Sequence, residues 1–407
     1  MREKAKEVAV TDKSVCATGT SVDVGTGVGS DADGLETGGA AGSSSWVAWE
    51  VVAARDRVVM MMRFSFSFHT LLLLLLSATV MGAANHGEKK ESSFPPKKLL
   101  TSPKKLLPLD LESLSFGYYA ETCPALEEIV YRNVNGWIDK DYTLGASLIR
   151  LHFHDCAIRG CDASILLNHT GSERSAKVSK SLRGFNVIDD IKAEVEQKCP
   201  KTVSCADILT AAARDATVKI GGPFWEVPYG RKDGLVSIAK EADMVPMGHE
   251  NITSLIEFFQ SRGLNVLDLV VLSGSHTIGR STCGSIQDRL YNFKGTGKPD
   301  PSIDAKYLNF LKRKCRWASE YADLDATTPK TFDSTYYNNL QKNMGLLSTD
   351  QLLYSDPQTA PIVSALATQP MLFYQQFGVS MVNVGNMQVL TGKDEGEIRV
   401  NCNFVNY

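Results

Sequence analysis

The most informative stretch of this 407-residue chain is residues 150–167, which read RLHFHDCAIRGCDASILL. On a helix, Arg150, Phe153 and His154 are spaced i, i+3 and i+4, so a cation, an aromatic ring and an imidazole share one face. Cys156 and Cys161 can close a tight loop beyond that helix. Oxygens from positions 155, 160, 162 and 164, together with loop carbonyls, suit a hard cation such as calcium. Taken singly, each of these residues is more often structural than functional.

Zinc is the other metal that this stretch brings to mind, because His152, His154 and Asp155 stand close together in sequence. Residues i and i+2 diverge on a helix, however, and no second histidine pair with zinc-site spacing accompanies them. We therefore favour calcium over zinc for this segment.

A second cluster lies at residues 272–279, LSGSHTIG, directly after the apolar run 266–272. His276 stands there among small and aliphatic residues, which is what an axial haem-ligand pocket needs. Asp350 is a candidate acceptor for its far ring nitrogen, where a carboxylate fixes the tautomer and makes the ligand more basic. Residues 325–333, DATTPKTFD, supply alternating oxygens for another calcium, with Thr277 in reach only if the fold brings it there.

The segments around these clusters have helical periodicity from about Leu114 onward. Residues 204–223 open with a capping-box-like pair, Ser204 and Asp207, and end at two glycines and a proline. Similar patterns predict helices within 254–263, 329–345 and 373–386, and alternating β runs are scarce. In residues 121–138 one helical face carries four apolar side chains: Leu126, Ile129, Val130 and Val134. The sequence therefore predicts an all-α unit of two lobes over residues 114–407.

The first 84 residues differ from the rest in composition. Residues 1–59 form a low-complexity extension that cannot bury enough apolar surface to offset its ordering entropy. Residues 60–84 then resemble a secretory signal, with Arg63 before the apolar stretch and cleavage expected near Ala84. Because about sixty residues precede this signal, we interpret residues 1–59 as a gene-model artefact, with translation starting at Met60, Met61 or Met62. A signal anchor is the alternative, since 64–84 is about long enough to span a bilayer.

Charge and cysteine content limit the classes of partner. The net charge is −3, which favours neither nucleic acid nor an anionic membrane as partner. Of nine cysteines, Cys16 leaves with the extension, and an even set of eight behind a signal indicates four disulfides in an oxidising compartment. Sequons at Asn168 and Asn251 can carry glycans. We interpret the Lys/Pro-rich residues 85–113 as a solvated linker; the alternative is that 86–110 tethers the protein to an acidic cell-wall polymer.

Seven motifs together resemble the plant secretory (class III) haem peroxidases over residues 114–407. They are RLHFHDCAIRGCDASILL (150–167), CPKTVSCADIL (199–209), LSGSHTIGRSTC (272–283), RLYNFKGTGKPDPSID (289–304), DATTPKTFD (325–333), GLLSTDQLL (345–353) and EIRVNCN (397–403). The resemblance implies the two-lobed haem peroxidase fold with haem b between distal and proximal lobes. It also implies a secreted enzyme, extracellular or in the cell wall, acting in the response to oxidative stress.

The same resemblance implies a role for each motif residue. His154 is the distal acid–base residue, Arg150 stabilises the cleavage of the peroxide O–O bond, and Phe153 is a wall of the distal pocket. His276 is the axial iron ligand, with Asp350 behind it. Hydrogen peroxide is reduced while small phenolic donors lose one electron each, and Pro246 lies at the edge where donors enter. We expect a monomer that contacts no membrane once the signal is removed.

Two calcium sites and four disulfides complete what the resemblance implies. The distal calcium is held by Asp155, Ile158, Gly160, Asp162 and Ser164, and the proximal calcium by Thr277, Asp325, Thr328, Thr331 and Asp333. The disulfides are Cys123–Cys199, Cys156–Cys161, Cys205–Cys402 and Cys283–Cys315, which uses all eight remaining cysteines.

The chain also departs from the family pattern. Relatives support the distal histidine with an asparagine tied to a glutamate, but residues 176–179 here read AKVS. The support is therefore missing or rebuilt from another group such as Glu173 or Ser179. Ala157, Arg159 and Ser275 also replace the residues usual at their positions. A haem-containing cell-wall binding protein with weakened catalysis is accordingly the alternative function.

Overall fold

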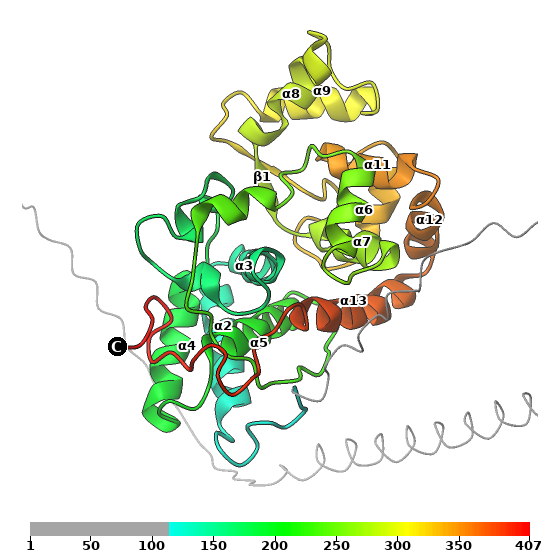
Figure 1. The fold of residues 1–407 in the computed structure, drawn as a ribbon. Coiled ribbons are helices and arrows are strands. Elements are labelled where there is room, and N and C mark those ends of the chain that lie inside the picture. Colours follow the sequence, from blue (N-terminus) through cyan, green and yellow to red (C-terminus); the bar gives the residue numbers. More distant parts are fainter. Residues whose placement is uncertain (1–113) are drawn as a thin grey trace, which may run out of the picture. The chain divides into compact units, whose positions relative to one another are not determined.

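The computed structural model describes residues 114–407. In this part of the chain, two groups of helices meet around a central pair of buried helices (Figure 1). At the centre, helix α3 (Leu144–Ile158) packs against helix α5 (Cys205–Lys219). Thirteen of the fifteen residues of α5 are buried, so this helix is covered by other segments on nearly all sides. The predicted segments 1–59, 60–84 and 85–113 lie outside the described residues.

Helices α2 (Leu126–Lys140) and α4 (Phe185–Lys198) pack on α5 and complete the first group of helices. The four apolar residues predicted for one face of α2 are all buried there. Ser204 caps α5 by accepting from the backbone N–H of Asp207. The side chain of Asp207 does not return the bond. It accepts instead from the buried Arg231, at 2.7 Å, and from Tyr119.

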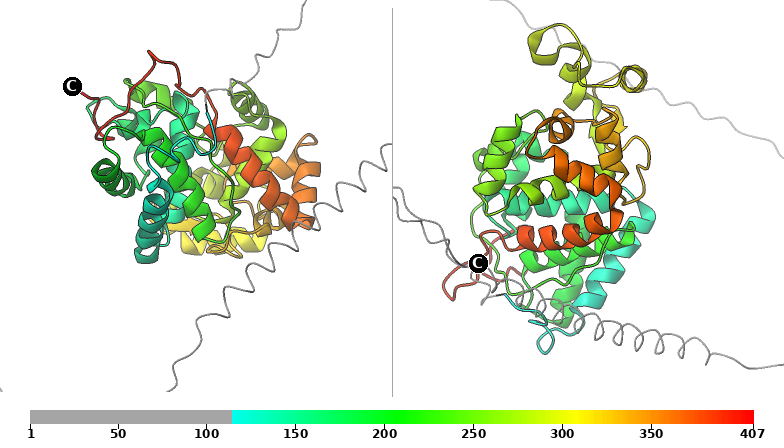
Figure 2. Two further views of the ribbon diagram at one scale, coloured as in Figure 1. Left: turned by 90° about the horizontal axis from the view of Figure 1, so that it is seen from below. Right: turned by 90° about the vertical axis from the view of Figure 1, so that its right-hand side faces the viewer.

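A second group of helices contains α6 (Ile252–Gln260), α7 (Val266–Ser273), α10 (Thr335–Gln341), α11 (Ser348–Ser355) and α12 (Ala360–Thr368). The long helix α13 (Pro370–Gly385) packs on α7 and α12 and also on α3, and thereby joins the two groups (Figures 1 and 2). Helix α6 begins two residues before the predicted start, because Asn251 accepts from the N–H of Ser254 and caps it. Of the predicted segment 329–345, only the middle part, Thr335–Gln341, is helical.

The remaining elements are short. Strands β1 (Arg280–Thr282) and β2 (Tyr321–Asp323) pair antiparallel, with Ser281 opposite Ala322. Helices α8 (Gln287–Tyr291) and α9 (Ala305–Lys314) lie beyond this pair and share a small hydrophobic core separate from the main one. The 3₁₀ turns are η1 (Ser164–Leu166), η2 (Glu173–Ser175), η3 (Lys177–Ser179), η4 (Ala239–Met244), η5 (Gly274–Thr277), η6 (Cys283–Ile286) and η7 (Phe293–Gly295).

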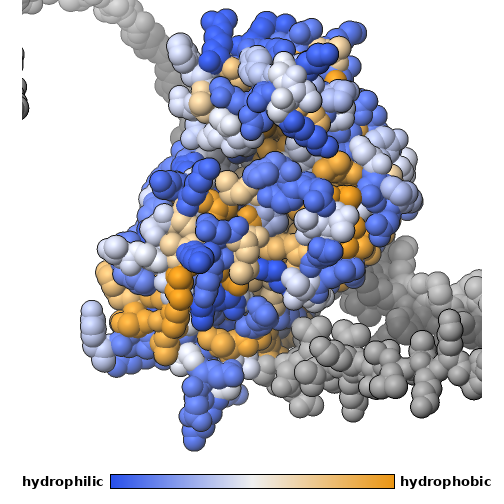
Figure 3. Space-filling model, turned by 45° about the horizontal axis from the view of Figure 1, so that its top comes forward, coloured by the Kyte–Doolittle hydropathy of each residue, from blue (hydrophilic) through white to orange (hydrophobic). Residues whose placement is uncertain are grey.

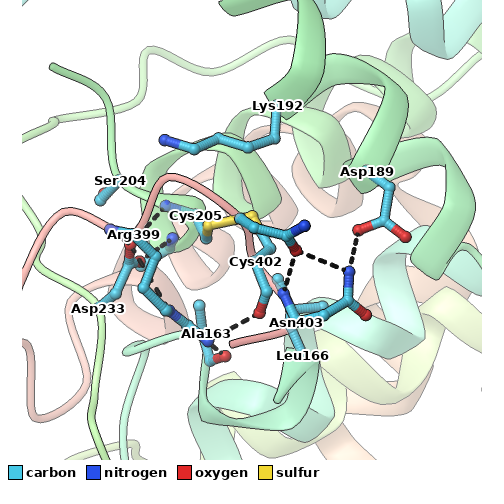
Figure 4. Close-up of a disulfide and its surroundings, with 12 residues drawn as sticks. Ala163, Leu166, Asp189, Lys192, Ser204, Cys205, Asp233, Arg399, Cys402 and Asn403 are labelled. Atoms are coloured by element: carbon cyan, nitrogen blue, oxygen red, sulfur yellow. Dashed lines mark hydrogen bonds and ion pairs between the residues drawn. A yellow bond between two sulfur atoms is a disulfide. The ribbon is translucent and has the colours of Figure 1, made fainter. Parts of the chain in front are cut away.

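The described residues contain four disulfides, in the same pairs that the resemblance implies: Cys123–Cys199, Cys156–Cys161, Cys205–Cys402 and Cys283–Cys315. Cys156–Cys161 closes a short loop, and the other three join residues 32 or more positions apart. The Cys205–Cys402 bridge ties the C-terminal segment to the start of α5 (Figure 4). Beside it the buried Arg399 donates to the carbonyls of Cys402 and Ala163, at 2.8 and 2.7 Å. Asp233 accepts backbone N–H bonds from both sides of this junction. The C-terminus is thus fixed to the main core by covalent and polar contacts.

The prediction of an all-α fold is confirmed, since the described residues contain one two-stranded sheet and are otherwise helical or irregular. No helix within residues 114–407 has the length and apolar character that crossing a bilayer requires.

Candidate active site

A cavity of about 820 Å³ opens between the two helix groups, and both predicted histidine clusters line it. Arg150, Phe153 and His154 reach it from α3 on one side. His276 reaches it from η5, directly after α7. Much of the remaining wall is apolar, with contributions from Phe259, Leu269, Leu272, Ile278 and Met381. The fold therefore brings together two imidazoles that are 122 positions apart in sequence.

On the α3 side, neighbouring segments fix two of the three side chains. The guanidinium of Arg150 donates to the carbonyl oxygen of Val178 and to the hydroxyl of Ser181, both at 3.2 Å. The ring of Phe153 stacks on that of Phe259, with 6.2 Å between centroids. Burial lowers the pKa of Arg150 to about 10, and the group stays cationic at neutral pH. This side of the cavity thus holds a positioned positive charge beside an imidazole.

His154 is buried, and its Nδ1 atom has no hydrogen-bond partner among the described residues. Burial, followed by the charge of Arg150, lowers its pKa well below the ordinary histidine value, which keeps the ring neutral. The sequence offers Glu173 and Ser179 in place of the asparagine and glutamate that support this histidine in relatives. Neither bonds to His154: a Glu173 oxygen accepts from Ser164 at 3.3 Å, and the Ser179 hydroxyl is itself buried without a partner.

On the opposite side, His276 is held from behind by a buried carboxylate. With its proton on Nδ1, it donates to Asp350 at 2.7 Å. Asp350 also accepts from the hydroxyl of Tyr336 at 2.9 Å and from the N–H of Leu347 at 2.8 Å. Burial alone would raise the pKa of Asp350, but the charge of His276 and these hydrogen bonds outweigh it and lower that pKa. The imidazole is therefore held by its Nδ1 side, and its Nε2 has no hydrogen bond to any residue of 114–407.

These features fit an iron porphyrin. The planar apolar group needs a wide cavity with aliphatic and aromatic walls, and the iron needs a neutral imidazole nitrogen with no competing bond. Nε2 of His276 meets the second condition, because the only hydrogen bond of this imidazole within the described residues uses the other ring atom. His154 differs because no carboxylate fixes its Nδ1 proton. The two imidazoles thus have unequal surroundings in one cavity.

The first predicted calcium set lies around the loop that follows α3, and its two carboxylates, Asp155 and Asp162, are buried and form no ion pair with another residue of 114–407. Asp155 accepts from the N–H groups of Ala163 and Ile165, and Asp162 accepts from that of Ser164. Burial and then the charge of Asp162 raise the pKa of Asp155 well above its usual value. Gly160 has φ +100°, and a Cβ atom there would lie 2.5 Å from the carbonyl oxygen of Gln388. Ile158 is the last residue of α3.

The second predicted calcium set is brought together by tertiary contacts. Thr277 lies 3.4 Å from a carboxylate oxygen of Asp333 and from the carbonyl oxygen of Thr331. Thr328 bonds to both Asp325 and Asp333. Burial, with hydrogen bonds opposing it, raises the pKa of Asp325.

Both sets have the chemistry that calcium prefers, with two carboxylates each and otherwise hydroxyl or carbonyl oxygens. Within residues 114–407, no group of three or more His, Cys, Asp or Glu side chains is arranged to hold a metal ion. His152 is buried beside the Cys156 sulfur, at 3.6 Å.

The remaining predicted positions have simple surroundings. Pro246 lines the cavity, as does Ser275. Ala157 is fully buried, and Arg159 forms an ion pair with Glu241 at 2.6 Å.

Sequence reasoning missed several contacts of the site. Tyr336, Ser181, Val178 and Phe259 touch its central side chains but belong to no motif that points to them. The only sequence signal for Tyr336 is its position within a predicted helical segment. That position indicates a buried side chain but does not identify Asp350 as its hydrogen-bond partner. These residues act through distant segments, which a local pattern does not identify.

Comparison with known proteins gives consistent matches. The family model described as Peroxidase matches residues 130–369. Peroxidase 7 of Arabidopsis thaliana is 57% identical over 305 residues, which cover 74% of this chain and 87% of the relative. Peroxidase 27 of the same plant is 46% identical, covering 72% of this chain and 93% of the relative. Peroxidase C2 of Armoracia rusticana is 45% identical, covering 72% and 88%.

Proposed function

The chain belongs to the class III plant haem peroxidases, and from this membership we propose that it reduces hydrogen peroxide to water while oxidising phenolic donors by one-electron steps. Family membership supports haem and calcium as its cofactors. We assign haem b to the cavity, where Nε2 of His276 would hold the iron, and one calcium ion to each oxygen set. The class III relatives are secreted, and we place the mature protein outside the cell as a monomer.

The proposed chemistry uses the unequal surroundings of the two imidazoles. Haem, when bound, supplies the redox chemistry. His154, neutral because it is buried, takes a proton from hydrogen peroxide and returns it to the oxygen that leaves as water. The cation of Arg150, positioned by Val178 and Ser181, stabilises the negative charge that develops as the O–O bond breaks. Phe153 narrows this side of the cavity and restricts larger molecules to its edge, near Pro246.

Asp350 has a supporting role in this proposal. Its carboxylate holds the proton on Nδ1 of His276, which leaves Nε2 available to the iron and would make the imidazole a stronger electron donor. Tyr336 and Leu347 in turn hold the carboxylate. The observation that carries the proposal is therefore one cavity with a carboxylate-bonded imidazole on one wall and a neutral imidazole beside an arginine on the other.

The test is stopped-flow reaction of the purified holoenzyme with hydrogen peroxide, followed by guaiacol oxidation. We expect His154→Ala to slow the peroxide reaction by about 10²–10⁴-fold, the usual value of general acid–base catalysis, while haem stays bound. His276→Ala should instead lose haem. His169→Ala is the matched control, since this histidine is exposed and neither it nor its sequence neighbours line the cavity. A His154→Ala rate within tenfold of wild type would exclude the proposed role.

The unpartnered Nδ1 of His154 favours one alternative, a haem-containing cell-wall binding protein with weakened catalysis. Without an acceptor, the ring is free to take either tautomer, and its basicity is lower. The same stopped-flow experiment separates the alternatives. A wild-type protein with a normal haem absorbance band but slow peroxide reaction would support the weakened form.

A further inference from the structure

Residues 283–320, which we call the α8–α9 lobe, project from one end of the helical unit (Figures 1 and 2). The lobe has its own small core, in which Tyr307 and Leu311 of α9 pack beside the Cys283–Cys315 disulfide. The buried Arg289 pairs with Asp300 at 2.8 Å and donates to the carbonyl of Leu346 at 2.7 Å. The lobe is therefore held in place by its own core, a disulfide and buried polar contacts. Its outer surface plays no part in the proposed reaction.

The outer surface of the α8–α9 lobe is strongly basic, although the chain as a whole has a net charge of −3. Apart from the internal Arg289–Asp300 pair, the lobe has three carboxylates, and two of them accept backbone N–H bonds: Asp304 at the start of α9 and Glu320 after its end. The lobe also has seven basic side chains that form no ion pair with a described residue: Lys294, Lys298, Lys306, Lys312, Arg313, Lys314 and Arg316. Figure 3 shows hydrophilic residues spread over this end of the molecule.

Aromatic side chains lie among these cations. Trp317 is 70% exposed, and Phe310 and Tyr291 are each 45% exposed. On α9, Lys306, Phe310 and Arg313 are spaced i, i+4 and i+7, so they follow one another along a single face. The ammonium group of Lys312 lies 5.1 Å from the ring centre of Tyr291. Phe310 stacks on the buried Tyr307, with 6.2 Å between ring centroids, and is held in place while much of its surface stays exposed. The lobe thus presents exposed rings interspersed with positive charge.

We propose that the α8–α9 lobe binds an acidic polysaccharide, a linear polymer of carboxylated sugars. Lysine and arginine side chains would pair with the carboxylates, and the flat rings would lie against the apolar faces of the sugars. An anionic membrane fits less well, because a membrane-binding helix needs a continuous apolar face and charges interrupt the rings here. Nucleic acid fits the charge equally, but the proposed location outside the cell, on which this inference rests, favours the polysaccharide.

The test measures binding of the haem-loaded enzyme to surface-immobilised polygalacturonate as salt is raised. We expect the triple variant Lys312→Gln/Arg313→Gln/Lys314→Gln to lose about tenfold or more in affinity and to respond less to salt, since several surface charges act together. Lys140→Gln/Lys198→Gln/Lys201→Gln removes the same charge from exposed positions at the other end of the unit, and should change affinity by no more than about twofold. Trp317→Ala should weaken the binding that remains at high salt.

Guaiacol turnover in solution serves as the folding control, because none of the altered residues lines the cavity. All variants should retain it, and loss of turnover in wild type would count against the proposed function and not against this surface. The inference is wrong if the triple variant binds polygalacturonate as wild type does. It is also wrong if duplex DNA or anionic vesicles, tested under the same salt, bind the lobe more tightly than polygalacturonate does.

Discussion

Replacing Asp350 by asparagine tests the proximal side of the site most directly. Three donors converge on this carboxylate: Nδ1 of His276 and the hydroxyl of Tyr336 reach one oxygen, and the N–H of Leu347 reaches the other. Asparagine keeps one acceptor oxygen and places an NH₂ group where the second oxygen stood. At least one buried donor then faces another donor, and the two remaining hydrogen bonds lose their charge assistance.

The size of the effect follows from these bonds. A buried unpaired donor costs about 1–3 kcal/mol, and charge-assisted bonds exceed neutral ones by about 1 kcal/mol each. We therefore expect Asp350→Asn to lower the free energy of unfolding by roughly 3 kcal/mol, or about a hundredfold in the ratio of folded to unfolded protein. The reduction potential of the bound haem should rise as well, because a neutral amide makes His276 a weaker electron donor.

Guanidinium unfolding followed by circular dichroism, with disulfides intact and calcium constant, gives the stability, and redox titration of the haem band gives the potential. Tyr336→Phe is the matched control. It removes one hydrogen bond worth about 1 kcal/mol but leaves the carboxylate charge, so its haem potential should stay unchanged. The reasoning is refuted if Asp350→Asn unfolds at the same denaturant concentration as wild type, or if both variants shift the potential equally.

Three further predictions concern other parts of the molecule. Burial, only partly opposed by Arg214, raises the pKa of Asp215 to about 6, so the native state holds more protons than the unfolded state between about pH 4 and 6. Stability should therefore fall by roughly 1–3 kcal/mol as pH rises through that window, and Asp215→Asn should flatten this part of the urea-measured profile. Gly160→Ala should lower the free energy of unfolding by about 2 kcal/mol or more, because a side chain there combines φ +100° with a backbone clash. Gly171→Ala, at φ +82° with no atom within 4 Å of the new Cβ, should lower it by only about 1 kcal/mol in the same urea assay. Chelation of calcium should lower the thermal midpoint of wild type, and Asp333→Asn, having lost one predicted ligand, should respond less in differential scanning calorimetry.

Each of these predictions has a contradicting outcome. A pH profile of Asp215→Asn that parallels wild type would show that this carboxyl titrates normally in the folded protein. Equal costs for the two glycine variants would mean that the loop after α3 moves aside without strain. An unchanged midpoint on chelation would remove calcium from the account of stability.

The sequence by itself determined the local part of this protein. Helical periodicity located α2, α5 and α13, because burial of one apolar face depends on residues only three or four positions apart. The same spacing put Arg150, Phe153 and His154 on one face of α3, and all three line the cavity. The number of cysteines indicated four disulfides, and the described residues contain four.

Only the tertiary structure decided the contacts between distant segments. It set the bond between His276 and Asp350, which are 74 positions apart, and the approach of Thr277 to Asp333, 56 positions away. It also left Nδ1 of His154 without a partner, which no spacing along α3 predicts. The physical reason is that a helix fixes the relation of neighbours through its own repeat, whereas partners from different segments depend on how whole helices pack and where the loops between them return.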